Sequence, residues 1–128
     1  MRHLDRRLVA PVLRRGKSVE NFAGRVPGVK VPSVRYIELR PSQGLIQIWA
    51  HDLADRGNED FTDLVEFPRL DFESSCAPVA AFEDPEAAIA FAETQFHVAP
   101  NRWTNVLVCH FDYADFVRAG RPDVWPVA

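Results

Sequence analysis

The sequence lacks the local signatures by which many enzymes and cofactor-binding proteins are recognised. Its six glycines are scattered along 128 residues, and none forms the glycine-rich turn between a strand and a helix that binds phosphate. No window approaches the ~18 continuous apolar residues of a membrane span. No apolar segment of a signal peptide follows the N-terminal arginines. These absences predict a cytoplasmic protein without a cofactor, a metal ion or a membrane partner.

The two cysteines are expected to be reduced, buried and unreactive. Cytosolic proteins keep their thiols reduced, and a free cysteine packs as a small hydrophobic residue. Cys109 lies in an apolar run, where burial raises the pKa of a thiol and lowers its reactivity. A disulfide between Cys76 and Cys109 is the alternative. A zinc site that also uses His97 and His110 does not fit the usual ligand spacing. Its only close pair of ligands is Cys109 and His110, and adjacent side chains point to opposite faces of a strand.

The net charge of −3 hides a strong separation of charge along the chain. Residues 1–30 hold eight basic residues against two acidic ones, a balance of +6. Residues 51–93 hold twelve acidic residues against two arginines, a balance of −10. A separation of charge of this size indicates which partners the protein binds and says little about its fold. The acidic body would repel phosphate, so we expect no nucleic acid partner.

Residues 1–33 are expected to form a basic N-terminal arm, extended or partly disordered unless it packs on the body. Pro11 limits any helix within this segment. The glycines and prolines between Gly16 and Pro32 are too closely spaced for a regular element. A single α+β domain is then expected over 34–128.

Five segments of the body show the alternation, apolar content or flanking turn residues that are typical of strands. The first two are joined by Ser42-Gln43-Gly44, which predicts an antiparallel hairpin. Because the strands cluster before the helices, the pattern favours an α+β fold with an antiparallel sheet of about four to five strands. The predicted strands are 34–40, 45–51, 62–67, 78–82 and 104–110.

The main helix is predicted over residues 85–96. Asp84 is a strong N-cap residue, and Pro85 suits the first helical position. Further along, Ile89 and Phe96 fall on one face of the helix. The helix is therefore expected to bury an apolar face against the sheet.

A short second helix is expected from Asp112 to Arg118. Asp112 is a suitable cap, Gly120 is a suitable stop, and Trp125 is expected to anchor the irregular tail. The residues predicted to be buried in the core are Ile37, Leu39, Ile48, Phe82, Val106 and Val108.

Two histidines stand close to acidic residues, as a general base does to its orienting carboxylate. His51 precedes Asp52, and His110 stands two residues before Asp112. One interpretation is therefore a small ligand-binding or enzymatic domain that uses His51, His110 and Asp112. The acids between Asp52 and Asp60 lack the spacing of a helix–loop–helix calcium site, and a solvated turn accounts for them.

Four segments of the body carry a resemblance to other proteins. They are Tyr36-Ile37-Glu38-Leu39-Arg40, Phe61-Thr62-Asp63-Leu64-Val65-Glu66-Phe67-Pro68, Asp84-Pro85-Glu86-Ala87-Ala88 and Arg102-Trp103-Thr104-Asn105. Together they resemble the small bacterial immunity proteins encoded beside secreted toxins, including those of contact-dependent inhibition systems. The resemblance spans about residues 34–122, and the segment 1–33 departs from it. It implies a protein that neutralises a cognate toxin, and it assigns no contact residue.

The preferred hypothesis is a binding protein rather than an enzyme, namely an immunity protein that covers the active site of a toxin. Such a protein needs a stable core and a complementary surface, and no catalytic group. The acidic stretch would capture a basic protein partner electrostatically, with Trp49 as an aromatic anchor. The candidate contact residues are Trp49, Asp52, Asp55, Glu59, Asp60, Asp63 and Glu66.

Overall fold

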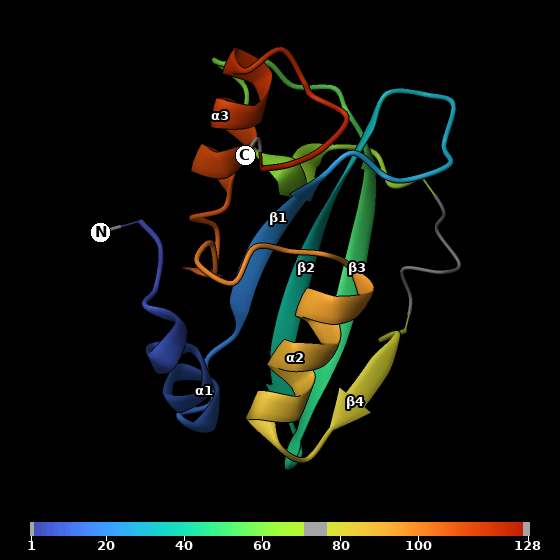
Figure 1. Ribbon diagram of the computed structural model, residues 1–128. Coiled ribbons are helices and arrows are strands. Elements are labelled where there is room, and N and C mark those ends of the chain that lie inside the picture. Colours follow the sequence, from blue (N-terminus) through green and yellow to red (C-terminus); the bar gives the residue numbers. More distant parts are fainter. Residues whose placement is uncertain (1, 71–76, 127–128) are drawn as a thin grey trace.

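In the computed structural model, which describes residues 2–70 and 77–126, the chain forms a five-stranded sheet with helices on both faces (Figure 1). The strands are β1 (Val19–Gly24), β2 (Ser33–Ser42), β3 (Leu45–Ala54), β4 (Ala80–Phe82) and β5 (Thr104–Asn105). The helices are α1 (Arg6–Arg14), α2 (Pro85–Gln95), α3 (His110–Arg118) and the short 3-10 helix η1 (Leu64–Glu66). The strand order is β4-β3-β2-β1-β5, and every pairing is antiparallel. The predicted α+β fold is confirmed.

The hairpin of β2 and β3 is the longest pairing of the sheet. It runs without a break from Ser33 opposite Ala54 to Ser42 opposite Leu45. Gln43 and Gly44 connect the strands with φ values of 51° and 82°, as a tight hairpin turn requires. The hairpin prediction is confirmed, and both strands extend beyond the predicted ranges.

Within the segment 1–33, which was expected to be an arm unless it packs on the body, residues 6–14 form α1 and residues 19–24 form β1, and both pack on the body. Val9 and Leu13 of α1 are buried beneath the sheet, and β1 pairs with both β2 and β5. Gly16 and Gly24 take φ values of 83° and 84°. They therefore supply left-handed turns at the two ends of β1, where sequence reasoning inferred irregular structure.

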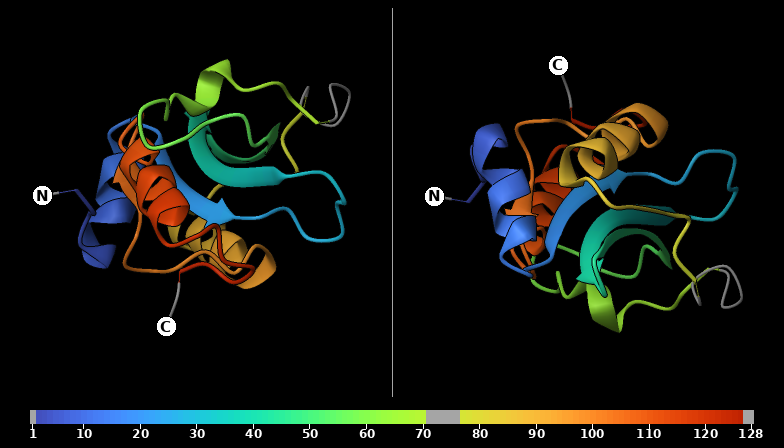
Figure 2. Two further views of the ribbon diagram at one scale, coloured as in Figure 1. Left: turned by 90° about the horizontal axis from the view of Figure 1, so that it is seen from above. Right: turned by 90° about the horizontal axis from the view of Figure 1, so that it is seen from below.

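Other elements lie against both faces of the sheet, as the two end-on views show (Figure 2), and both faces are buried. One face packs against α1 and α2, and its core includes Ile37 and Ile48. The other packs against α3 and η1 around Phe22, Tyr113 and Phe116. Since alternate residues of a strand point to opposite faces, β2 contributes to both cores. Of the six predicted core residues, Ile37, Leu39 and Ile48 are fully buried.

Helix α2 confirms the main helical prediction. Asp84 caps it by accepting a hydrogen bond from the backbone nitrogen of Glu86, and Pro85 opens the helix. Ile89 and Ala92 are fully buried. Phe96 follows the helix and is half-buried, so its predicted burial was too strong.

The predicted strand 62–67 is wrong, because this segment contains η1. Leu64 and Phe67 are buried at a three-residue spacing, which matches a 3-10 helix better than a strand. The predicted strand 78–82 is present but shorter, as β4, and Phe82 is only half-buried.

The predicted strand 104–110 ends after Asn105. Leu107 has a φ of 73°, which no strand tolerates, and Val106 is 46% exposed. Helix α3 then begins at His110. Asp112 lies in its first turn rather than at its cap, a second correction.

Gly120 stops α3 as predicted, with a φ of 85°. Its nitrogen donates to the carbonyl of Val117, and the nitrogen of Arg121 donates to the carbonyl of Phe116. This pair of bonds is the Schellman arrangement at a helix end. Trp125 anchors the tail by packing against Phe116 and Phe22.

Ile48→Ala should destabilise the protein strongly, by about 2–5 kcal/mol, because it removes a fully buried side chain and leaves a cavity. Val106→Ala is the matched control. Its side chain is 46% exposed, so the expected change stays within about 0.5 kcal/mol. Urea unfolding of both variants measures the difference. Equal midpoints for the two variants would contradict the described packing.

Candidate functional site

A loop that follows β3, residues 55–66, combines a buried anchor with an exposed tip; we call it the acidic loop. Asp55 is the anchor, and its side chain is 3% exposed. The carboxylate accepts hydrogen bonds from the Tyr113 hydroxyl and, at 2.8 Å, from Arg121 Nε. Arg121 Nη2 also donates to the carbonyl of Gly57 at 2.8 Å. Asp55 therefore ties the acidic loop to α3 and to the tail.

The turn of the acidic loop tolerates only glycine at position 57. A Cβ there would lie 2.3 Å from the carbonyl oxygen of Phe61 and 2.5 Å from a ring carbon of Phe67. Asn58 closes the turn, because its Oδ1 accepts hydrogen bonds from the backbone nitrogens of Asp60 at 2.8 Å and Phe61 at 3.0 Å. Packing and hydrogen bonds thus hold the loop in a defined shape.

The tip of the acidic loop presents both charge and apolar surface. Phe61 is 40% exposed and Val65 is 57% exposed, so both side chains reach solvent at the tip. Acidic side chains surround them in the sequence. The acidic and large apolar side chains of the loop tip that are exposed or half-exposed are Glu59, Asp60, Phe61, Asp63, Val65 and Glu66.

Two long contacts connect this tip to α3. Glu59 lies 3.7 Å from Arg118, and Asp63 lies 3.9 Å from His110. Burial lowers the pKa of His110 against the opposing effect of Asp63, so this imidazole is mainly neutral at pH 7. Both contacts are weak, and the acids stay available for other cations.

Three of the residues predicted to contact a partner lie away from the tip. Asp55 is buried, so its assignment as a contact residue is corrected to that of an anchor. Asp52 on β3 accepts two hydrogen bonds from Arg35, at 2.6 and 2.9 Å. The Trp49 ring stacks beneath Arg40, whose guanidinium carbon is 4.3 Å from the ring centroid. Sequence reasoning did not name Phe61 as a contact residue. Its position between Asp60 and the acids that follow in the sequence could have indicated it.

A polar cluster lies on the sheet face that also carries α3. His51 is 4% exposed and stacks against Tyr36. Its Nε2 lies 2.9 Å from Glu38, and its Nδ1 lies 3.2 Å from Arg69. Burial would raise the pKa of Glu38, but hydrogen bonds from His51 and Arg40 outweigh it and lower this pKa to about 2. These mutual contacts leave the imidazole enclosed rather than open to a substrate.

Glu20 stands opposite Glu38 in the pairing of β1 with β2 and is 5% exposed. Its Oε1 accepts hydrogen bonds from the backbone nitrogen of Leu107, at 2.9 Å, and from the thiol of Cys109. Burial raises the pKa of Glu20, because these two donors compensate only in part. Burial, with Glu20 beside it, also raises the pKa of the free Cys109 thiol, which fits an unreactive cysteine. Cys76 lies outside the described residues.

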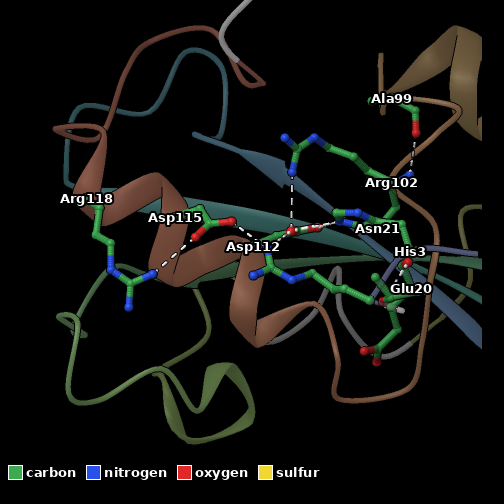
Figure 3. Close-up of polar contacts among 10 residues, drawn as sticks. His3, Glu20, Asn21, Ala99, Arg102, Asp112, Asp115 and Arg118 are labelled. Atoms are coloured by element: carbon green, nitrogen blue, oxygen red, sulfur yellow. Dashed lines mark hydrogen bonds and ion pairs between the residues drawn. The ribbon is translucent and has the colours of Figure 1, made fainter.

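Asp112 is the centre of a second polar cluster (Figure 3). Its carboxylate is completely buried and is bound by His3 at 2.9 Å, Arg2 at 2.9 Å and Arg102 at 3.3 Å. Arg2 also pairs with Asp115. The cluster fastens the start of the chain to α3, so the basic N-terminal segment has an internal role that its charge alone did not indicate.

The three residues of the alternative interpretation have separate partners. His51 contacts Glu38, His110 contacts Asp63, and Asp112 contacts the N-terminal segment. Within residues 2–70 and 77–126, no hydrogen bond or ion pair joins any two of them. In the same ranges, no group of three or more His, Cys, Asp or Glu side chains is placed to hold a metal ion.

Comparisons with known proteins supply no relative: no family model, no curated protein and no solved structure matches the chain. Among the helices of the described residues, none is long and apolar enough to cross a membrane. The geometry of the acidic loop and of the two polar clusters therefore carries the functional argument.

Glu38→Gln should change the acid stability of the protein. The folded-state pKa of about 2 lies below the ordinary 4.5, so ionised Glu38 stabilises the fold above pH 4.5. This stability is lost as the pH falls through the interval from 4.5 towards 2. The wild type should therefore be more stable than the variant at pH 7, and the gap should close in acid. Urea unfolding at a series of pH values measures it.

Glu20→Gln is the contrasting variant, because burial shifts this pKa in the opposite direction. The buried, ionised Glu20 carboxylate lowers the folding stability of the wild type at high pH, and protonation in acid removes this effect. The variant should match or exceed the wild type in stability at pH 7 and lose this advantage as the pH falls. The same trend for both variants would contradict the assigned hydrogen bonds.

Proposed function

We propose that this protein is an immunity protein, which neutralises a cognate bacterial toxin by covering its active site with the acidic loop. The single observation that carries the proposal is the division of the acidic loop into a buried anchor and an exposed tip. Asp55 and Gly57 hold the loop, while Phe61 and Val65 project among acids that are weakly paired or have no ion-pair partner in the described part of the chain. The partner is a basic protein domain.

A loop of this kind is suited to binding because its shape is fixed before the partner arrives. Ordering a flexible loop on binding costs free energy, and a pre-organised loop avoids that cost. Here the hydrogen bonds to Asp55 and from Asn58 remain inside the protein when the tip is covered. The exposed tip is then available for contact without any rearrangement of the core.

The two kinds of exposed side chain have different roles in the proposed complex. The acids attract a basic surface and raise the association rate, an effect that salt screens. The apolar side chains of Phe61 and Val65 lose water on binding and slow dissociation. The contact set that the geometry supports is Glu59, Asp60, Phe61, Asp63, Val65 and Glu66.

The toxin is identified by capture with the tagged protein from a lysate of its own source, followed by mass spectrometry. The loop variant Glu59→Gln, Asp60→Asn, Glu66→Gln should reduce the association rate with the captured protein by about ten-fold or more at low salt. The effect should vanish as salt is added. The variant should fold normally, because exposed charges add little to stability.

The matched control removes three exposed acids elsewhere, as Glu83→Gln, Glu86→Gln, Asp123→Asn, and should leave the association rate nearly unchanged. Immunity is tested separately, by co-expression. The wild type should protect cells from the captured protein and abolish its activity at equal amounts. The proposal fails if no basic protein is retained, if the captured protein stays active when bound, or if both triple variants associate at the wild-type rate.

A further inference from the structure

A compact group of cations remains exposed at the end of α1, where the helix dipole favours positive charge. Arg14, Arg15 and Lys17 are all exposed. Within the described ranges, none of their side chains makes a hydrogen bond or an ion pair, unlike Arg2 and Arg6 of the same segment. We call the three residues the basic cluster.

A shallow groove lies beside the basic cluster. It has a volume of about 430 Å³ and is lined by Lys17, Ser18, Asn105 and Val106. Val106 is 46% exposed, so the groove combines an apolar side chain with a cation. The acidic loop has the opposite charge, because its aromatic side chain lies among acids.

The basic cluster and the acidic loop lie at opposite ends of the sheet (Figure 1). Lys17 precedes Val19, which pairs with Leu39 near the hairpin end of β2, whereas the acidic loop follows Ala54 at the far end of β3. Leu39 lies opposite Ile48, six residues before Ala54, and strands rise about 3.3 Å per residue, so about 20 Å of strand separates Val19 from the start of the acidic loop. Among the described residues, no hydrogen bond or ion pair joins the basic cluster to the acidic loop of the same molecule.

We infer that a second copy of this chain binds here, with its acidic loop against the basic cluster and its Phe61 in the groove beside Lys17. Both charge and apolar surface are complementary in this contact. An extended polyanion such as a nucleic acid fits less well, because the chain as a whole has a net charge of −3 and the loop acids would repel it.

The contact joins two different surfaces; in its head-to-tail form each pair of copies makes it once, rather than twice about a two-fold axis. A head-to-tail contact leaves a free loop and a free cluster at the two ends of each assembly, and further copies add unless a ring closes. The average mass should therefore rise continuously with protein concentration. Since exposed charges drive the contact, it should be weak and depend on salt.

Self-association would also regulate toxin binding, since a second copy bound to the acidic loop excludes the toxin from it. Only this consequence rests on the proposed function. The contact itself is measured with the pure protein and no toxin, so the failure of either proposal is distinguishable from the failure of the other.

Sedimentation velocity of the full chain is compared at about 0.01 M and 0.15 M salt, where the screening length falls from about 30 Å to about 8 Å. At low salt the wild type should give an average mass above that of one chain, which rises with concentration. At the higher salt it should approach the monomer. Arg15→Glu should prevent association, and Lys30→Glu, an equal change of charge at an exposed site outside the cluster, should not.

Reversing the charges of the basic cluster and of the acidic loop tests whether these two surfaces bind each other. An acidic variant, Arg15→Glu with Lys17→Glu, and a basic variant, Glu59→Lys with Asp60→Lys, should each remain monomeric at low salt. An equal mixture should associate, because opposite charges then face each other again. Phe61→Ala should weaken the wild-type association without changing its salt dependence.

Circular dichroism confirms the fold of each variant, since cations at the end of α1 also interact favourably with the helix dipole. A monomeric wild type at low salt overturns the inference. So does a mixture that fails to associate, or an Arg15→Glu variant that associates as Lys30→Glu does. An assembly that stops at two copies would show a symmetric dimer and would equally overturn the head-to-tail contact.

Discussion

The unbroken pairing of β2 with β3 is the constraint on which the rest of the structure depends. Both faces of this hairpin are buried, so β2 places Ile37 in one core and Tyr36 in the other. Helices α1 and α2 cover the first face, which leaves the second to α3 and η1. The chain that leaves β3 must therefore cross to the side of α3. That path brings Asp55 against Tyr113 and turns the acidic loop outwards.

Glu38 and Glu20, on the second face of the sheet, differ in how well their buried charges are compensated. A buried charge costs several kcal/mol unless hydrogen bonds and an opposite charge compensate it. Glu38 has both, from Arg40 and His51, whereas Glu20 has only a backbone nitrogen and a thiol. The difference explains the opposite directions of their pKa shifts. It also explains how Leu107 keeps a left-handed conformation, since the Glu20 carboxylate holds its nitrogen.

Local signals predicted the parts of the fold that local interactions determine. The hairpin follows from strand alternation and a two-residue turn, and α2 follows from Asp84 and Pro85. The sequence misled where distant contacts decide the structure. Residues 104–110 look like a strand, but the contact of Glu20 with Leu107 joins positions 87 residues apart. The burial of Asp55 depends in the same way on Tyr113 and Arg121, which are 58 and 66 residues away.

Folding converts the charge separation of the sequence into two smaller surfaces. Many charged residues pair internally: Arg2 and Arg6 from the basic segment bind acids of α3 and α2, and Asp52 and Asp55 from the acidic stretch bind arginines. What remains exposed at the two ends of the sheet is the basic cluster and the tip of the acidic loop. Lys30, Arg56 and Glu83 are exposed as well, so a partner meets only part of the charge of each segment. In the proposed complexes, the net charge of each segment indicates the sign of the partner's charge, and the pairing within the fold determines which charges stay available to it.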